Sequence, residues 1–254
     1  MTKKKIITDT NIWYTISNEE IFNISKDYQL VVPVIVLNEI YTSPNISLSE
    51  ETFENLKKAV NRILQNLNCL EFIEYYPFHY LLKNSYSEIK REQNSKFYID
   101  EFNALVKLNY ETVKNKSAIR GDISGLTEHI NNTSLSYKKV INKNLESKTK
   151  FKKINTLELT ESLILKYVNE ILEIEDVNFP KINELTTENE LLLKTFDKLL
   201  REVSTVTTKK IEDNDWFDIF NLIYVGKDDL YWTHEVSKKK LIIDLGLENY
   251  LYEK

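Results

Sequence analysis

Residues 1–45 combine two short β-branched runs with a mostly apolar stretch after the second run. The β-branched runs lie within residues 4–8 and 30–32 and are of the kind that forms strands. Pro33 suits the first turn of a helix, which the pattern predicts over residues 34–43. Strands that lead into helices at this spacing predict βαβ units with a parallel sheet.

The C-terminal end of the chain shows the same kind of alternation. Amphipathic helices are predicted over residues 213–225 and 236–245, and each is followed by a glycine, which commonly ends a helix. A strand is predicted between them at residues 230–233, and residues 250–252 resemble a final strand. We therefore expect both ends of the chain to contribute to one sheet.

The middle of the chain has a different pattern. Apolar residues recur three and four positions apart through most of residues 49–208, which predicts a block of about five or six helices. Polar stretches at residues 121–125 and 131–134 are predicted loops. The expected fold is an α/β core with a parallel sheet, built from residues 1–48 and 209–254, with a large α-helical insertion.

Composition narrows the class of protein. The chain has 254 residues with only four Gly and four Pro, which favours long helices over many tight turns. Its single cysteine excludes a disulfide framework and a cysteine-based zinc site. No apolar run has the length of a membrane span, and no secretory signal is evident, so we expect a cytoplasmic protein without a membrane partner. The net charge of −5 requires any nucleic acid to contact a local basic patch.

Acidic residues stand at the ends of the first and last predicted strands. Asp9 directly follows the first of these strands, and Glu235 comes shortly after the last one. Ligands of parallel α/β sheets bind at the carboxyl ends of the strands, so both positions suit a functional site. A plainer alternative is that each acid caps the helix that follows it.

Three further acids occur within predicted helices. Glu39 lies about two turns into an apolar helix, although a solvent-facing position would also explain it. Asp215 and Asp218 are three residues apart and share one helix face. The helix dipole accounts for Asp215 in the first turn, but Asp218 lies too deep for that explanation. Together with Asp9 and Glu235, these acids suit Mg²⁺ or Mn²⁺, and their mutual repulsion should raise some pKa values.

These segments, in this order, resemble the motifs of the PIN-domain nuclease family. The similarity lies in residues 7–12 (strand, Asp, then Asn two residues later), 32–39 (a Pro-started helix with a Glu), 218–224 and 231–235. It covers about a third of the chain, and the helical middle matches no family motif. The last acid is Glu235, where the family usually has Asp.

The resemblance implies metal-dependent hydrolysis of phosphodiester bonds, mostly in RNA. It implies Asp9, Glu39 and Asp218 as catalytic ligands of Mg²⁺ or Mn²⁺. Asp215 and Glu235 would be supporting acids, with Asp215 a further ligand if a second metal binds.

Residues beside these acids are candidates for binding substrate. By resemblance, Asn11 and Thr233 would hold the acids or contact phosphate. Lys238 and Lys239 belong to a basic run near Glu235 that suits a phosphate-steering role, although solvated surface charge explains such a run equally simply.

The sequence thus predicts an endoribonuclease acting on single-stranded or loop RNA, with a toxin or phage-defence effector as the expected setting. The helical insertion would select the substrate, or bind a protein partner or a second copy of the chain. Two alternatives stay open. One is a catalytically degenerate PIN-like scaffold that binds RNA or protein through its insertion. The other is a helical interaction protein whose acids are all helix caps.

Overall fold

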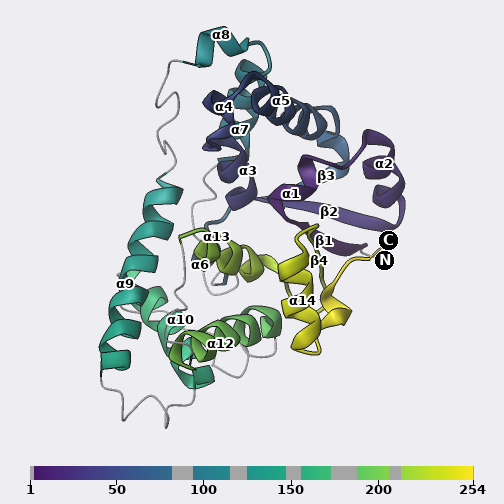
Figure 1. The fold of residues 1–254 in the computed structure, drawn as a ribbon. Coiled ribbons are helices and arrows are strands. Elements are labelled where there is room, and N and C mark those ends of the chain that lie inside the picture. The colour runs from purple at the N-terminus through teal and green to yellow at the C-terminus, as the bar shows by residue number, and fades with distance from the viewer. Residues whose placement is uncertain are drawn as a thin grey trace.

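The computed structural model describes residues 3–81, 94–114, 125–146, 156–172, 188–205 and 213–253. A four-stranded, all-parallel sheet lies on one side of the described chain, with helices around it (Figure 1). The strands are β1 (Lys4–Thr8), β2 (Tyr28–Pro33), β3 (Leu70–Ile73) and β4 (Leu230–Trp232), and their order in the sheet is β3-β2-β1-β4. The predicted α/β class with a parallel sheet formed by both chain ends is confirmed.

The centre of the sheet is apolar on both faces because helices cover it. Ile6 and Ile7 of β1 are fully buried, and they pair with β2 on one side and with β4 on the other. Continuous apolar runs of this kind are typical of parallel strands that are covered on both faces. Pairing of β1 with β4 brings residues from the two ends of the chain together at the carboxyl ends of the strands.

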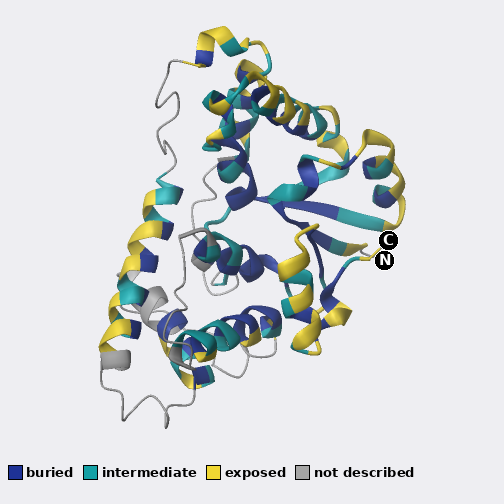
Figure 2. Ribbon diagram, in the orientation of Figure 1, coloured by how far each residue is buried: buried dark blue, intermediate teal, exposed yellow. Residues whose placement is uncertain are grey.

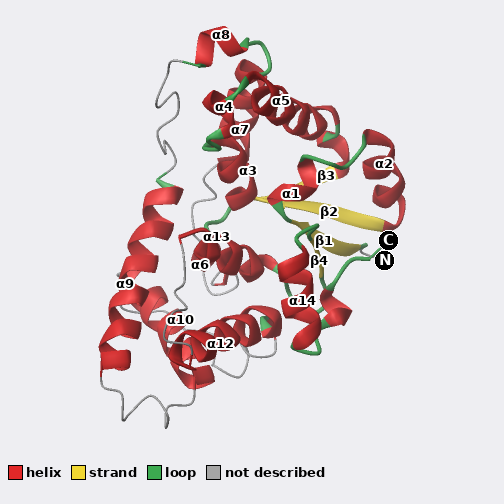
Figure 3. Cartoon of the chain, viewed as in Figure 1, coloured by secondary structure: helices red, strands yellow, loops and turns green. Residues whose placement is uncertain are grey.

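Helices occupy most of the remaining described chain (Figure 3). The N-terminal half contains α1 (Thr10–Trp13), α2 (Asn18–Asp27), α3 (Val34–Tyr41), α4 (Asn45–Leu48), α5 (Glu50–Gln65), η1 (Leu67–Cys69), α6 (Pro77–Leu81), α7 (Asn94–Leu105) and α8 (Tyr110–Val113). The C-terminal half contains α9 (Leu126–Glu146), α10 (Thr156–Leu172), α12 (Glu190–Thr205), α13 (Asp213–Asn221), η3 (Leu222–Tyr224), α14 (Val236–Asp244) and η4 (Glu248–Tyr250).

The helices that flank the predicted site form where the sequence indicates. Pro33 directly precedes α3, and its φ of −66° suits a helix start. The α14 helix ends before Gly246, whose φ of +68° is a left-handed conformation that glycine adopts without steric cost. The predicted final strand is reduced to a single bridge between Leu251 and Tyr231, next to η4.

Two local predictions for the helical middle are wrong. Residues 70–73 form β3, which pairs with β2, so the stretch from 49 to 208 also contributes to the sheet. Residues 131–134 lie inside α9 and do not form a loop. The hydroxyls of Thr133 and Ser134 donate to the carbonyls of His129 and Asn131, which satisfies these side chains within the helix. The other predicted loop, at residues 121–125, lies almost wholly outside the described residues.

Residues of α9, α12 and α13 form an aromatic cluster. Helices α9 and α12 lie away from the sheet (Figure 1), and each carries buried residues (Figure 2). Tyr137, Phe196, Trp216 and Phe220 are all nearly or completely buried. Trp216 packs edge-on against Tyr137 and Phe196, with ring centroids 5.6 and 5.7 Å away. Helix α13 thus joins the helical side to the sheet. Among the described helices, none combines the length and apolar character that a membrane crossing requires.

Candidate active site

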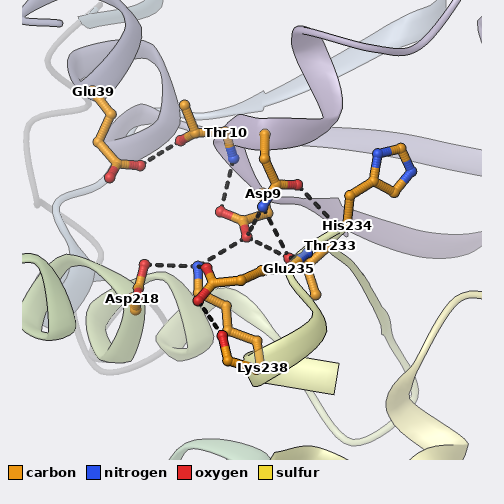
Figure 4. A network of polar contacts seen from close by, with 10 residues as sticks. Asp9, Thr10, Glu39, Asp218, Thr233, His234, Glu235 and Lys238 are labelled. Carbon is orange, nitrogen blue, oxygen red and sulfur yellow. Dashed lines mark hydrogen bonds and ion pairs between the residues drawn. The ribbon is translucent and has the colours of Figure 1, made fainter. Parts of the chain in front are cut away.

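The proposed site lies where β1 and β4 end side by side (Figure 4). The backbone N–H of Asp9 donates to the carbonyl oxygen of Trp232 at 2.9 Å, which fixes the first residue after β1 against the last residue of β4. Helix α3 begins directly after β2, the other neighbour of β1. Side chains that follow three adjacent strands therefore meet at one edge of the sheet, as parallel α/β sheets dictate.

Asp9 is 4% exposed, and hydrogen bonds hold both of its carboxylate oxygens. Oδ1 accepts from the backbone N–H of Thr10 at 2.8 Å, so Asp9 does cap the short helix α1. Oδ2 accepts from Asn11 Nδ2 at 2.9 Å and from Thr233 Oγ1 at 2.7 Å. The capping alternative is therefore correct for one oxygen only, because the other oxygen points into a polar network.

Thr233 and Asn11 connect the two ends of the chain around Asp9. The Thr233 side chain is fully buried, and its hydroxyl accepts from Asn11 Nδ2 and from the Glu235 N–H, both at 3.1 Å. Asn11 Oδ1 accepts from the backbone N–H of His234 at 2.9 Å. Both residues predicted to hold the acids thus contact Asp9, and these bonds orient its carboxylate.

Glu39 points from α3 toward the same polar region and is not a solvent-facing helix residue (Figure 4). Its Oε2 accepts a hydrogen bond from the Thr10 hydroxyl. Burial raises the pKa of the Glu39 carboxyl to about 7. The Thr10 hydrogen bond opposes this rise, and the negative charges of Asp9 and Asp218 add to it.

Asp218 contributes a third carboxylate from α13. Partial burial raises its pKa to about 6, the nearby Lys238 opposes the rise, and Asp9 adds to it. The predicted increase in pKa among the acids is confirmed for Glu39 and Asp218. In both residues, however, burial contributes more than the mutual repulsion that the sequence suggested.

Lys238, in the first turn of α14, lies between the acids. Its ammonium nitrogen lies 2.9 Å from Asp9 Oδ2, 2.7 Å from Asp218 Oδ1 and 3.2 Å from Glu235 Oε2. Its side chain is only 14% exposed. Burial alone would lower the pKa of Lys238, but the neighbouring Tyr231, Asp9 and Asp218 together outweigh burial and raise it above its ordinary value. The site therefore already contains one cation, which belongs to the chain.

The ion pairs of Lys238 differ from both roles that the sequence suggested for the basic run at Lys238 and Lys239. The sequence suggested that Lys238 and Lys239 steer phosphate or are plain surface charges. The described structure instead places the Lys238 ammonium on the acids, so solvated surface charge is the wrong explanation for this residue. Lys239 is only partly buried on the same helix and stays a predicted phosphate contact.

Glu235 and Asp215 lie at the margins of the cluster. Glu235 precedes α14 without a side-chain capping bond, and its carboxylate contacts Lys238 and Ser237. Asp215 lies one turn before Asp218 on α13 and is not among the described residues that contact the Lys238 ammonium. The structure thus brings together Asp9, Asp218 and Glu235 directly, and Glu39 through its electrostatic coupling to Asp9 and Asp218.

Two buried polar residues beside the acids were not predicted. Tyr231 of β4 is fully buried, and Asn221 of α13 is 2% exposed. Neither the Tyr231 hydroxyl nor the Asn221 amide has a hydrogen bond of ordinary geometry to the described residues. Burial raises the pKa of Tyr231, Asp9 and Asp218 add to the rise, and Lys238 and the adjacent Asn221 side chain oppose it. Asn221 could have been found from its position three residues after Asp218, on the same helix face.

The chemistry of this cluster fits a hard divalent cation. Three carboxylates face a position that a cation already holds, and oxygen ligands are what Mg²⁺ and Mn²⁺ prefer. Mg²⁺ also keeps several water ligands, for which the Asn221 amide and the Tyr231 hydroxyl are suitable buried partners. Among the described residues, no three His, Cys, Asp or Glu side chains lie close enough together to hold a metal ion in the present arrangement around Lys238.

Comparisons of the whole chain with known proteins add no family assignment to this geometry. Protein-family models, curated proteins and solved structures were compared with it, and none of them matches.

Proposed function

We propose that this protein is a metal-dependent endoribonuclease with a PIN-like core. The observation that carries the proposal is the convergence of Asp9, Glu39, Asp218 and Glu235, which come from distant parts of the sequence, at the carboxyl end of a parallel sheet. A cluster of buried carboxylates is costly without cations. Hydrolysis of a phosphodiester bond is a reaction that such a cation site supports.

Asp9, Glu39 and Asp218 would hold Mg²⁺ or Mn²⁺, with Asp215 and Glu235 as supporting acids. The bound ion would lower the pKa of a water molecule and neutralise charge that develops on the phosphate. Thr233 and Asn11 orient Asp9 through the two hydrogen bonds to Oδ2. Thr10 orients Glu39 through Oε2 alone, which leaves Oε1 available to a cation.

The substrate we propose is single-stranded or loop RNA. The resemblance to PIN-domain nucleases favours RNA, and the net charge of −5 limits contact to a local basic surface. Lys239 lies on α14 beside the acids and is suited to bind phosphate. The helical region, including α9, α10 and α12, would then govern which RNA is cut.

A second candidate is a catalytically degenerate PIN-like scaffold that binds RNA or protein. The specific observation in its favour is Lys238, because an ammonium that neutralises the acids can replace a metal ion for structural purposes. Glu235 in place of the usual Asp agrees with this candidate as well.

The decisive experiment measures cleavage of labelled single-stranded and hairpin RNA by the purified chain with Mn²⁺, with Mg²⁺ and with EDTA. The nuclease should cut only with metal, and Asp9→Asn should abolish cleavage. Asp228→Asn, at an exposed acid in the turn before β4, is the matched control and should cut normally. Cleavage in EDTA, or by Asp9→Asn, would contradict the metal mechanism, and a wild-type protein that never cuts would favour the scaffold.

A further inference from the structure

The ammonium group of Lys238 forms ion pairs with three carboxylates, those of Asp9, Asp218 and Glu235. The contact with Asp9 Oδ2 is also a hydrogen bond that the ammonium donates. These carboxylates come from the end of β1, from α13 and from the residue before α14. The lysine therefore links three segments that would otherwise bring like charges together.

The same contacts place the ammonium where a shared divalent cation would have to lie. Asp9 and Asp218 are two of the residues that our proposed function assigns to the metal, and Lys238 Nζ lies 2.9 Å from Asp9 Oδ2 and 2.7 Å from Asp218 Oδ1. A metal ion and the ammonium cannot share these two oxygens in this arrangement, because each needs direct contact with both. Binding of one is then coupled to release of the other.

Lys238 is able to leave without any change of the backbone. Its ammonium is carried on a flexible four-carbon stem. The outer acids of the cluster are open to solvent, with the side chain of Asp218 36% exposed and that of Glu235 43% exposed. Asp9 differs, since it is buried and keeps hydrogen bonds from Thr10, Asn11 and Thr233 when the lysine leaves.

We propose that Lys238 is a built-in counter-ion that competes with the divalent cation, so that metal binds only by displacing its ammonium from Asp9 and Asp218. This inference rests on the proposed function and adds a means by which metal binding to the site is regulated. Lys238 stabilises the metal-free protein and weakens its affinity for metal. When metal is scarce, the ammonium group occupies the acids in place of the metal ion.

The test uses the full chain and Mn²⁺ alone, with affinity measured by calorimetry. Lys238→Met keeps the aliphatic stem and removes the charge, so it should bind Mn²⁺ at least about 10-fold more tightly than the wild type, while its metal-free melting temperature falls. Lys240→Met, at an exposed lysine of the same helix, is the matched control and should change neither quantity.

A measurement on the wild-type protein covers the case in which Lys238→Met does not fold. The Lys238 ammonium should give a protected ¹⁵N signal in the metal-free protein, assigned with Lys238→Arg. Added Mg²⁺ should remove that signal. A signal that persists while Mg²⁺ binds would overturn the proposal.

The calorimetric outcomes separate this inference from the proposed function. Equal or weaker Mn²⁺ binding by Lys238→Met, with a wild type that binds Mn²⁺ and cuts RNA, would overturn the role of Lys238 alone. Absence of Mn²⁺ binding in the wild type and in Lys238→Met would overturn both the inference and the metal-dependent nuclease.

Discussion

The carboxyl end of the sheet and the aromatic cluster of the helical region are both buried, but different forces organise them. At the sheet, directed hydrogen bonds and ion pairs fix Asp9, for example the 2.7 Å bond from Thr233. In the helical region, apolar rings pack without directed bonds, as between Phe196 and Tyr137, whose centroids are 5.9 Å apart. Directed contacts do not tolerate a change of chemical group, whereas packed rings tolerate changes that preserve volume.

Helix α13 belongs to both regions. Trp216 and Phe220 face the aromatic cluster, and Asp218, between them in sequence, contacts Lys238 at the sheet. One short helix therefore carries a side chain of the proposed reaction and side chains that stabilise the fold. Substitutions on its two faces, and in the two regions, should separate turnover from stability.

The largest effect should come from the site face of α13. Asp218→Asn removes a charged oxygen ligand while keeping size and helix propensity, so RNA cleavage should fall by about 100- to 1000-fold. Circular dichroism should show an unchanged helix content. If this variant retained near wild-type turnover at saturating Mn²⁺, Asp218 would not be a residue of the site. The two faces of α13 would then not be divided between turnover and stability.

The helical side should respond to acid through His129 of α9. Burial, together with a smaller effect of the stacked ring of His79, 6.0 Å away, lowers the pKa of His129 to about 4. The folded state then disfavours the protonated form, so this stabilisation is complete above pH about 6.5 and is lost as the pH falls toward 4. Between pH about 7.5 and 5 the loss should be roughly 1–2 kcal/mol.

Urea unfolding at both pH values measures this loss. The His129→Gln variant should lose roughly 1–2 kcal/mol less than the wild type over the same interval, because glutamine does not titrate. Its RNA cleavage at neutral pH should match that of the wild type. An identical pH dependence in variant and wild type would show that His129 does not contribute this term.

A smaller effect is expected where apolar packing alone is altered. Phe196→Leu in α12 keeps most of the buried volume, so the free energy of unfolding should fall by about 1 kcal/mol. Turnover per folded molecule should not change. Leu135→Ala, at an exposed residue of α9, is the control and should change stability by less than about 0.5 kcal/mol. A Phe196→Leu variant that is stable but inactive would show that the two regions are coupled.

The difference between the regions also explains how much the sequence could predict. Elements with strong local signals were predicted, such as β1, α3 with its leading Pro33, and α14, which ends before Gly246. The short β3 was missed because four residues with Glu71 among them carry little strand signal of their own. Pairing with β2, which is a tertiary contact, is what makes them a strand.

The acids of the candidate site were predicted from the sequence, but the position of the Lys238 ammonium among them was not. Strand ends identify Asp9 and Glu235, and helix depth identifies Asp218, because backbone periodicity determines where these residues point. The position of the Lys238 ammonium depends on how α14 packs beside the sheet and on the conformation of a long, flexible side chain. The hydrogen bond from Thr10 to Glu39 likewise depends on packing between elements that are distant in sequence.

The smallest effect should come from Asp215, which tests how far the site extends along α13. Asp215 lies in the first turn, where the helix dipole stabilises an anion by about 0.3–1 kcal/mol, and it does not join the described contacts of Lys238. Asp215→Asn should therefore leave turnover within a few-fold of the wild type. Turnover of Asp215→Asn and Asp218→Asn should be compared across a Mn²⁺ titration. If Asp215→Asn were the more damaged variant, or required far more Mn²⁺, a second metal would bind at the first turn of α13. The site would then extend one helical turn toward the aromatic cluster.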